Sequence, residues 1–321
     1  MTSQAAIETA GLTKHFPGVK ALSDLTLEVP RGSIYGFLGP NGAGKTTALK
    51  MLAGLTRPTS GTAAVAGIPI SAGAAYRQAV GFLGQEPRFY GWMTGREVVE
   101  YVGSLYPADA RPHARRIQEV LDLVGIADAA DRPSKTYSGG MRQRLGIAQA
   151  IVARPKVVLL DEPVSALDPI GRREVLELMT ALKGEVTVFY STHILDDVQR
   201  VSDHVAILDH GELIRAQPTA ELLSSFTRDR MRVVLGFATD DTAVALAAIP
   251  GVLSVEPTDR DADSRSYSLR IDPDASPAIQ RGVTRLAADT DLTVIDNSLV
   301  REGLEDVFMR LVDGGSKERA A

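Results

Sequence analysis

Short apolar runs alternate with longer segments of mixed apolar and polar residues along the first 222 positions of the chain. The runs at 34–38, 157–160 and 186–190 give the strongest strand predictions. The last two are continuous apolar or β-branched runs, which is typical of strands that are buried on both faces. Segments with helical periodicity separate these runs. The alternation predicts an α/β domain in which crossover helices connect the strands of a parallel sheet.

The pattern changes after a charged segment at 228–230. A short helix is predicted before it, at 220–226, and six elements after it, in the order strand, helix, strand, strand, helix, strand. The residues that indicate these six elements are Val233, Leu235 and Phe237 on one strand face, 241–249 as helix, 252–256 as strand, Tyr267, Leu269 and Ile271 in alternation, Ser276 as a helix cap before Pro277, and 292–295 as strand. This order predicts a small α+β domain of the ferredoxin-like type. We therefore place a domain boundary near 228, between a domain at 1–228 and a smaller one at 229–321.

The chain ends in a segment where apolar residues recur at helical spacing, namely Leu304, Val307, Phe308 and Leu311. The spacing predicts a final helix with one apolar stripe. Packing on its own domain is the expected role of this stripe, and docking to a partner is the alternative.

Composition excludes several classes of protein. The 35 Lys and Arg against 40 Asp and Glu give a formal net charge of −5, which argues against a basic coat for nucleic acid, and we expect no nucleic-acid partner. The absence of cysteine excludes disulfides, thiolate metal sites and cysteine nucleophiles. We also expect no membrane span and no secretory signal, because no apolar run approaches the roughly 18 residues that a membrane helix needs.

The first motif that carries chemistry lies between the apolar run at 34–38 and a helical segment. It matches the G-x-x-x-x-G-K-[ST] pattern of a phosphate-binding loop. Its glycines let backbone N–H groups converge on a triphosphate at a helix N-terminus. Lys45 is expected to reach the β and γ phosphates, and the hydroxyl of Thr46 to ligate Mg²⁺. The predicted ATP-binding residues of this segment are Gly39, Pro40, Asn41, Gly42, Ala43, Gly44, Lys45, Thr46 and Thr47.

Two carboxylates, Asp161 and Glu162, follow the buried strand at 157–160. A parallel strand delivers such residues to the carboxyl edge of the sheet, where the phosphate-binding loop also lies. Asp161 is therefore predicted to hold Mg²⁺, and Glu162 to orient and polarise an attacking water.

The segment 137–143 reads Tyr-Ser-Gly-Gly-Met-Arg-Gln and precedes a predicted helix at 144–153. It resembles the signature of the ATP-binding cassette family, which reads close to L-S-G-G-Q. Position 137 departs from Leu and position 141 from Gln, in the manner of drug-export-type members. The resemblance implies a mixed-sheet ATP-binding domain with a helical subdomain at about 86–155. It also implies that the γ-phosphate of ATP held by a partner subunit is bound by the signature residues Ser138, Gly139, Gly140, Met141 and Gln143.

Other positions resemble further parts of the same family in the expected order. Gln85 resembles the glutamine that contacts Mg²⁺, Asp168 the aspartate that communicates across the dimer, His193 the switch histidine at the γ-phosphate, and Phe16 the aromatic that stacks on adenine. Taken alone, Phe16 is more typical of a core residue. The remaining histidines match no chemical pattern and are interpreted as structural: His15, His113, His204 and His210.

The resemblance implies an ATPase that works as a head-to-tail dimer with two composite ATP sites and that joins separate membrane subunits at the cytoplasmic face of the membrane. An aromatic cluster at 87–106, with Trp92 as the only tryptophan, is either the interface for a membrane subunit or part of the core of the helical subdomain. The signature and the segment 301–311 resemble daunorubicin-resistance-type ATPases, which indicates export of a drug, lipid or polyketide. The alternatives are an importer ATPase with a ligand-sensing tail and a tail that serves dimerisation or regulation.

Overall fold

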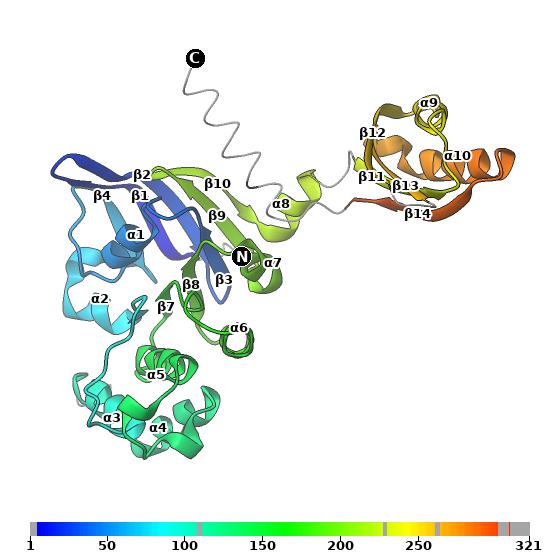
Figure 1. The fold of residues 1–321 in the computed structure, drawn as a ribbon. Helices are drawn as coiled ribbons and strands as arrows, with labels where there is room; N and C mark the ends of the chain where they lie inside the picture. The colour runs from blue at the N-terminus through cyan, green and yellow to red at the C-terminus, as the bar shows by residue number, and fades with distance from the viewer. Residues whose placement is uncertain (1–4, 108–110, 227–229, 261–263, 301–307, 309–321) are drawn as a thin grey trace. The chain divides into compact units, whose positions relative to one another are not determined.

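The structure is a computed structural model, and it describes residues 5–107, 111–226, 230–260, 264–300 and 308. The chain forms two compact units that divide between Thr219 and Ala220 (Figure 1). The boundary predicted near 228 falls within 227–229, outside the described residues, and the helix α8 (Thr219–Phe226) precedes that point. Among the described residues, no helix has the length and apolar character needed to cross a bilayer.

A six-stranded sheet forms the centre of the first unit. Five of its strands run parallel, and β10 pairs antiparallel with β9 at one edge. In spatial order the strands are β10 (Glu212–Pro218), β9 (His204–Asp209), β3 (Ile34–Leu38), β8 (Thr187–Thr192), β7 (Val157–Asp161) and β6 (Val80–Leu83). Every residue of β7 and β8 is buried, as their continuous runs predict, and so is every residue of β3.

A second, antiparallel sheet lies across α1 (Lys45–Leu52) from the first. Its strands in spatial order are β2 (Val19–Pro30), β1 (Ala5–Phe16), β4 (Ser60–Val65) and β5 (Ile68–Pro69). One apolar core joins both sheets, with Leu27 of β2, Leu49 of α1 and Phe189 of β8 in the same cluster. This core fixes the start of α1, and therefore the phosphate-binding loop, against the carboxyl ends of the parallel strands.

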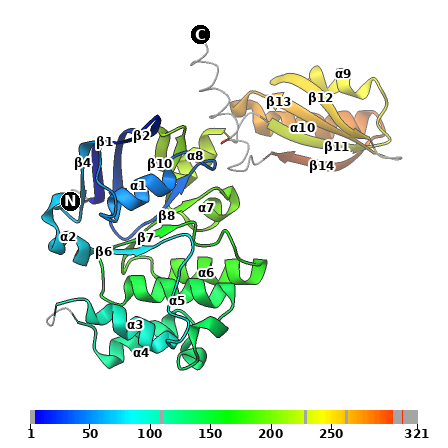
Figure 2. The ribbon, with the colours of Figure 1, turned by 60° about the vertical axis from the view of Figure 1, so that its left-hand side comes forward.

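The remaining helices cover the sheet and build a helical subdomain. The connecting helices are α2 (Ala74–Ala79), α6 (Pro169–Ala181) and α7 (Leu195–Val201), and the helices that pack on one another in the subdomain are α3 (Gly95–Ser104), α4 (Ala114–Leu123) and α5 (Gly139–Ile151). In both views the subdomain lies at the end of the unit opposite to β1 and β2 (Figures 1 and 2). The α/β domain with a helical subdomain is thus confirmed.

The second unit has the predicted order β-α-β-β-α-β. Its elements are β11 (Arg230–Gly236), α9 (Thr242–Ala247), β12 (Val252–Arg260), β13 (Ser264–Ile271), α10 (Ser276–Asp289) and β14 (Thr293–Leu299). The strands form one antiparallel sheet in the order β12-β13-β11-β14. Alternating residues of β11 and β13 share a core with Leu246 of α9 and Ile279 of α10, so both helices cover the same face. This arrangement confirms the ferredoxin-like prediction.

Three sequence predictions fail in detail. Phe237, predicted to share a strand face with Val233 and Leu235, lies beyond the end of β11, has a φ of +61° and is 71 % exposed. Ser276 is not a helix cap, because a 3₁₀ turn at Pro273–Ala275, capped by Asp272, runs directly into α10 and gives Ser276 helical dihedral angles (φ −52°, ψ −42°). The helix predicted at 144–153 begins earlier, at Gly139. The predicted final helix at 304–311 lies outside the described residues, except for Phe308, which is helical and half-buried.

Candidate nucleotide-binding site

The phosphate-binding loop connects the end of β3 to the start of α1 and is held tightly by its neighbours. A Cβ atom at Gly39 would collide with the carbonyl oxygen of Leu208, and one at Gly44 with the carbonyl oxygen of Ala21. Gly44 also has a φ of +100°, which side chains other than glycine rarely adopt. The loop backbone is therefore fixed by β9 and β2, and the N–H groups at the start of α1 face the cavity beside it.

Lys45 is the first residue of α1 and lies under the loop, with a relative exposure of 5 %. Its ammonium group donates hydrogen bonds to the carbonyl oxygens of Gly39 at 2.7 Å and Pro40 at 3.0 Å, and lies 3.4 Å from a carboxylate oxygen of Glu162. Burial lowers the pKa of Lys45, while the charge of Glu162 opposes this change. A phosphate that enters the loop brings negative charge to this cation, which favours its protonated form.

The register of the parallel sheet places Asp161 beside Ser191 and within hydrogen-bond distance of Thr46. Asp161 ends β7 opposite Ser191 of β8, whose hydroxyl donates a 2.7 Å hydrogen bond to the Asp161 carboxylate. The hydroxyl of Thr46 donates to the same carboxylate oxygen at 3.0 Å. Ser191 was not predicted as a site residue, and the signal that identifies it is its place two residues before His193 on a strand that pairs with β7.

Glu162 lies next to Asp161 and connects three parts of the site. Its backbone N–H donates to the hydroxyl of Ser191 at 2.9 Å, and its φ of +49° is unusual for a residue other than glycine. One carboxylate oxygen faces Lys45, and the other lies 2.9 Å from Nδ1 of His193. This carboxylate is buried, with 6 % relative exposure, so its position is set by the ion pair with Lys45 and the hydrogen bond with His193.

A cavity of about 570 Å³ opens over these groups. Six predicted residues of the loop and its helix line it, together with the predicted Gln85 and Glu162. Four further lining residues come from the start of β2 and from the β9–β10 turn and were not predicted. The complete lining is Val19, Lys20, Ala21, Asn41, Gly42, Gly44, Lys45, Thr46, Thr47, Gln85, Glu162 and His210. His210, interpreted as structural from the sequence, therefore reaches the cavity.

Magnesium is compatible with the oxygen atoms on one side of this cavity. The Thr46 hydroxyl and the Asp161 carboxylate lie within hydrogen-bond distance of each other, and Gln85 lines the same cavity. Hydroxyl, carboxylate and amide oxygens suit this hard cation, which usually keeps several waters and takes phosphate oxygens as further ligands. Among the described residues, no group of three or more His, Asp or Glu side chains could hold a metal. The donor set therefore fits Mg²⁺ that arrives with a triphosphate.

The signature residues lie at the N-terminus of α5. Ser138 is the N-cap, and its hydroxyl accepts a hydrogen bond from the N–H of Met141 at 3.2 Å. Gly139 and Gly140 begin the helix, and a Cβ atom at either glycine would lie no closer than 3.8 Å to atoms outside its own helix, which is an ordinary van der Waals contact. Gln143 is buried, with 6 % relative exposure. No signature residue is among the described residues that line the cavity of the phosphate-binding loop.

Tyr137, which replaces the leucine of the family pattern, is accommodated by the subdomain. It is buried, and its hydroxyl donates a 2.7 Å hydrogen bond to the carbonyl oxygen of Ala129. Gly95 provides the space, because a Cβ atom there would collide with this hydroxyl. The tyrosine at the position where the family has leucine therefore packs inside the helical subdomain, beneath the signature residues that follow it.

We expect Tyr137→Phe to lower the free energy of unfolding by about 1 kcal/mol, because it leaves the carbonyl of Ala129 without its hydrogen bond. Urea denaturation of the full chain measures this change. Tyr101→Phe is the matched control, since Tyr101 is 49 % exposed. Equal stability of the two variants would contradict the role of the hydroxyl.

Asp168 and Phe16 are not among the described residues that line the cavity. Asp168 is exposed at the start of α6, where its carboxylate accepts a 2.8 Å hydrogen bond from the N–H of Gly171. Gly171 in turn lies against Gly140 of the signature.

Phe16 is 45 % exposed at the end of β1, opposite Val19, with the Lys14 ammonium group 4.9 Å from its ring centre. Phe16 is therefore not a core residue, and its pairing places it beside the β2 end that lines the cavity.

Comparison with known proteins agrees with this geometry. The family model of the ABC transporter matches residues 22–165, which include the phosphate-binding loop, the signature and both carboxylates. The daunorubicin/doxorubicin resistance ATP-binding protein DrrA of Streptomyces peucetius is 39 % identical over 98 % of this chain and 96 % of its own length. The bacitracin transport ATP-binding protein BcrA of Bacillus licheniformis is 32 % identical over 97 % of this chain and 98 % of its own.

A solved structure of an ATP-binding subunit of an ABC transporter superposes with a TM-score of 0.61 at 27 % identity, and the match covers 69 % of this chain and 93 % of that one. The sequence matches to DrrA and BcrA, by contrast, run through both units of this chain. The chain therefore belongs to the ATP-binding subunits of ABC transporters, which are ATPases that couple ATP hydrolysis to transport.

Proposed function

We propose that this chain is the ATPase of an exporter for a drug, lipid or other hydrophobic compound, and that it works with separate membrane subunits. The observation that carries this proposal is similarity along almost the whole chain to DrrA and BcrA, whose names refer to daunorubicin/doxorubicin resistance and bacitracin transport. The similarity includes the second unit, so it extends beyond the ATP-binding fold that importers and exporters share. The alternative is an importer ATPase with a ligand-sensing tail, and the transport experiment described below distinguishes it from an exporter.

Two copies of the chain are proposed to bind ATP between the phosphate-binding loop of one and the signature of the other. Two observations support a partner at the signature. Ser138 and Gly139 are exposed, and the cavity over Lys45 contains no signature residue among its described lining. The space around Gly139 and Gly140 is also not needed by this chain itself, since a methyl group fits at both positions. The two glycines therefore leave room for a ligand held by another subunit.

We expect Gly139→Ala to reduce ATP turnover at least tenfold without loss of stability. The added methyl group has room in the isolated chain but would occupy the space of the partner's γ-phosphate. Replacing a helical glycine by alanine is otherwise neutral or stabilising. Phosphate release and urea denaturation measure the two quantities. Undiminished turnover, or a loss of stability that matches the loss of turnover, would contradict the proposed arrangement.

Hydrolysis is proposed to follow from the groups around Glu162. Its carboxylate accepts the proton of the attacking water as general base, and His193, already hydrogen-bonded to it, positions this carboxylate and contacts the γ-phosphate. Lys45 exchanges the carboxylate of Glu162 for phosphate oxygens when ATP binds, which frees Glu162 for the water. Mg²⁺, held by Thr46, Asp161 and Gln85, would neutralise charge on the β and γ phosphates.

An exposed aromatic pair in the helical subdomain is the proposed contact for a membrane subunit at the cytoplasmic face of the membrane. Tyr90 is 62 % and Trp92 72 % exposed, and their ring centres lie 6.0 Å apart. Met93, next in the chain, is buried. The cluster predicted from the sequence is thus divided: one part fills the subdomain core, and the other presents aromatic surface of the kind that dominates binding energy at interfaces.

We expect Trp92→Ala to reduce recovery of the membrane subunit at least fivefold in affinity purification of tagged protein from detergent-solubilised membranes. The unfolding free energy should change by less than about 0.5 kcal/mol, as is usual for surface substitutions. Leu105→Ala is the control, because Leu105 is 68 % exposed on the same subdomain. Equal recovery with wild-type and Trp92→Ala protein would exclude Trp92 from the interface.

The experiment that tests export first identifies the membrane protein recovered with tagged Glu162→Gln protein and ATP. Transport is then measured with this membrane protein and the wild-type chain in inside-out vesicles. Accumulation of a hydrophobic compound inside these vesicles in the presence of ATP supports export. Recovery of an importer-type membrane subunit, or transport in the opposite direction, would overturn the proposal in favour of the alternative.

A further inference from the structure

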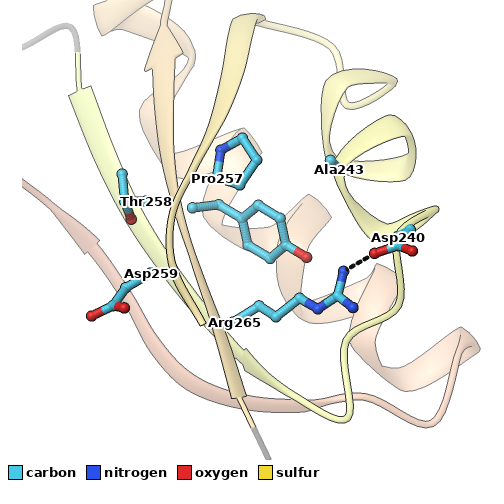
Figure 3. Close-up of a pocket in the computed structure, with 7 residues that line it drawn as sticks. Asp240, Ala243, Pro257, Thr258, Asp259 and Arg265 are labelled. Carbon is cyan, nitrogen blue, oxygen red and sulfur yellow. Dashed lines mark hydrogen bonds and ion pairs between the residues drawn. The ribbon is translucent and has the colours of Figure 1, made fainter. Parts of the chain in front are cut away.

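The second unit contains a cavity of about 550 Å³ beside one end of its sheet (Figure 3). The cavity exists because α9 is much shorter than the strand on which it packs. Six helical residues extend about 9 Å, whereas the nine residues of β12 extend about 30 Å. The end of β12 at Pro257–Asp259 and the start of β13 are therefore left uncovered, and a volume of this size is typical of small-molecule sites.

The strand backbone at this end is irregular. Pro257 pairs with Tyr267 and Asp259 with Ser266, so Thr258 has no partner in β13. A bulge of this kind bends the strand and changes the direction of neighbouring side chains. β12 is an edge strand, which explains why a proline is tolerated there.

Arg265 is the cation of the cavity, and its counter-ion is largely exposed to solvent. Its side chain is 18 % exposed and donates a hydrogen bond to Asp240, whose side chain is 90 % exposed (Figure 3). Such a pair contributes little, because water screens the exposed carboxylate. A guanidinium has five N–H donors and can hold a carboxylate through two parallel hydrogen bonds. A carboxylate on a ligand can therefore replace Asp240 at small cost.

Tyr267 provides a second polar group that needs a partner. The residue is 1 % exposed and lines the same cavity. Its hydroxyl interacts with the guanidinium of Arg265 but completes no hydrogen bond of normal geometry with any residue that the structure describes. A buried hydroxyl whose hydrogen bonding is incomplete is unfavourable, and such groups in folded proteins usually point to a missing water or ligand. An oxygen atom of a ligand bound to Arg265 would satisfy it.

The surrounding charges and walls restrict the ligand further. Asp240 and Asp259 with Arg265 give the lining a formal charge of −1, so a doubly charged anion such as a phosphate monoester is disfavoured. In Figure 3 the carboxylate of Asp259 points away from Arg265, which leaves the guanidinium accessible to one negative group. Pro257, Ala243 and the ring of Tyr267 form an apolar wall beside it.

We propose that this cavity binds a small organic monocarboxylate with an apolar body, whose carboxylate is held by Arg265 and accepts a hydrogen bond from Tyr267. Asp240 acts as a removable counter-ion that competes with the ligand. All residues that line the site belong to the second unit.

The test is ligand-observed NMR titration of the full chain with 4-phenylbutyrate, in the presence of a saturating non-hydrolysable ATP analogue that keeps the carboxylate away from Lys45. Asp240→Asn should tighten binding at least threefold, because the competing carboxylate is removed. Arg265→Gln should weaken it at least tenfold, and Arg281→Gln, on the exposed face of α10, should leave it unchanged. Opposite effects of two neighbouring substitutions cannot come from a general loss of structure.

If Arg265→Gln fails to fold, as thermal denaturation shows, Arg265→Lys serves instead and should weaken binding at least threefold, because lysine cannot form the bidentate pair. Three results would overturn the proposal. The first is that 4-phenylbutyrate does not bind the wild-type chain at a ligand concentration of about 10 mM, where even a weak site would be occupied. The others are stronger binding of 4-phenylbutylamine than of 4-phenylbutyrate, and unchanged binding of 4-phenylbutyrate after substitution of Arg265. Binding of the ATP analogue, measured in the same samples, separates such a failure from a failure of the ATP site.

Discussion

Replacement of Glu162 by Gln is expected to abolish nearly all ATP turnover while ATP binding persists. The Glu162 carboxylate is buried and held by the Lys45 ammonium at 3.4 Å and by His193 at 2.9 Å, so it is positioned before the substrate arrives. A glutamine keeps the shape but cannot accept the proton of water, and loss of a general base costs roughly 10²- to 10⁴-fold in rate. We therefore expect phosphate release at saturating MgATP to fall at least 100-fold.

Glu177→Gln is the matched control for this prediction. Glu177 lies on α6 with its side chain 59 % exposed, in a surface ion pair with Arg173. Its substitution should change turnover less than twofold. If the Glu162→Gln variant kept more than one-tenth of wild-type turnover, another residue would have to act as the base, and the assignment of Glu162 would be wrong.

Replacement of Lys45 by Ala is expected to weaken ATP binding by about 10- to 100-fold. Lys45 is the buried cation under the loop, and a hydrogen bond to a charged group contributes about 1.5–3 kcal/mol, where about 1.4 kcal/mol corresponds to a tenfold change in affinity. Equilibrium binding of a fluorescent ATP analogue measures this loss. Since the substitution also leaves Glu162 without its buried partner, urea denaturation of the same samples is needed.

Lys50→Ala separates the role of the site from the role of the helix. Lys50 lies on the same helix, α1, but is exposed to solvent and lines no part of the cavity described here. Its substitution should leave ATP affinity within twofold of wild type. Similar losses in both variants would mean that α1 is generally sensitive to substitution, and the role of Lys45 at the phosphates would then lose its support.

Local patterns predicted the elements that carry the chemistry. The runs that became β3 and β7 are apolar throughout because both faces are covered, and the loop and the carboxylates follow them directly. The start of α5 was missed because two glycines, which are poor helix formers, occupy its first positions, and the hydroxyl of Ser138 compensates as a cap.

Contacts between distant segments were not predictable in the same way. Ser191 supports Asp161 only because the sheet register places them side by side, and Lys20 and His210 reach the cavity through the packing of β2 and the β9–β10 turn. The cavity beside Arg265 likewise depends on the difference in length between α9 and β12, for which the sequence offered no pattern.

The most direct test of the account is disulfide cross-linking between two copies of the chain, which is simple here because the chain has no cysteine. Asn41→Cys protein is mixed with Ser138→Cys protein, both carrying Glu162→Gln, and oxidised with and without ATP. If ATP is bound between the phosphate-binding loop of one copy and the signature of the other, a cross-linked dimer should form with ATP and at most weakly without it. Asn41→Cys mixed with Ser104→Cys, an exposed position on α3, should give no ATP-dependent product. Equal cross-linking in both mixtures, or none in either while ATP binding is verified, would contradict the account.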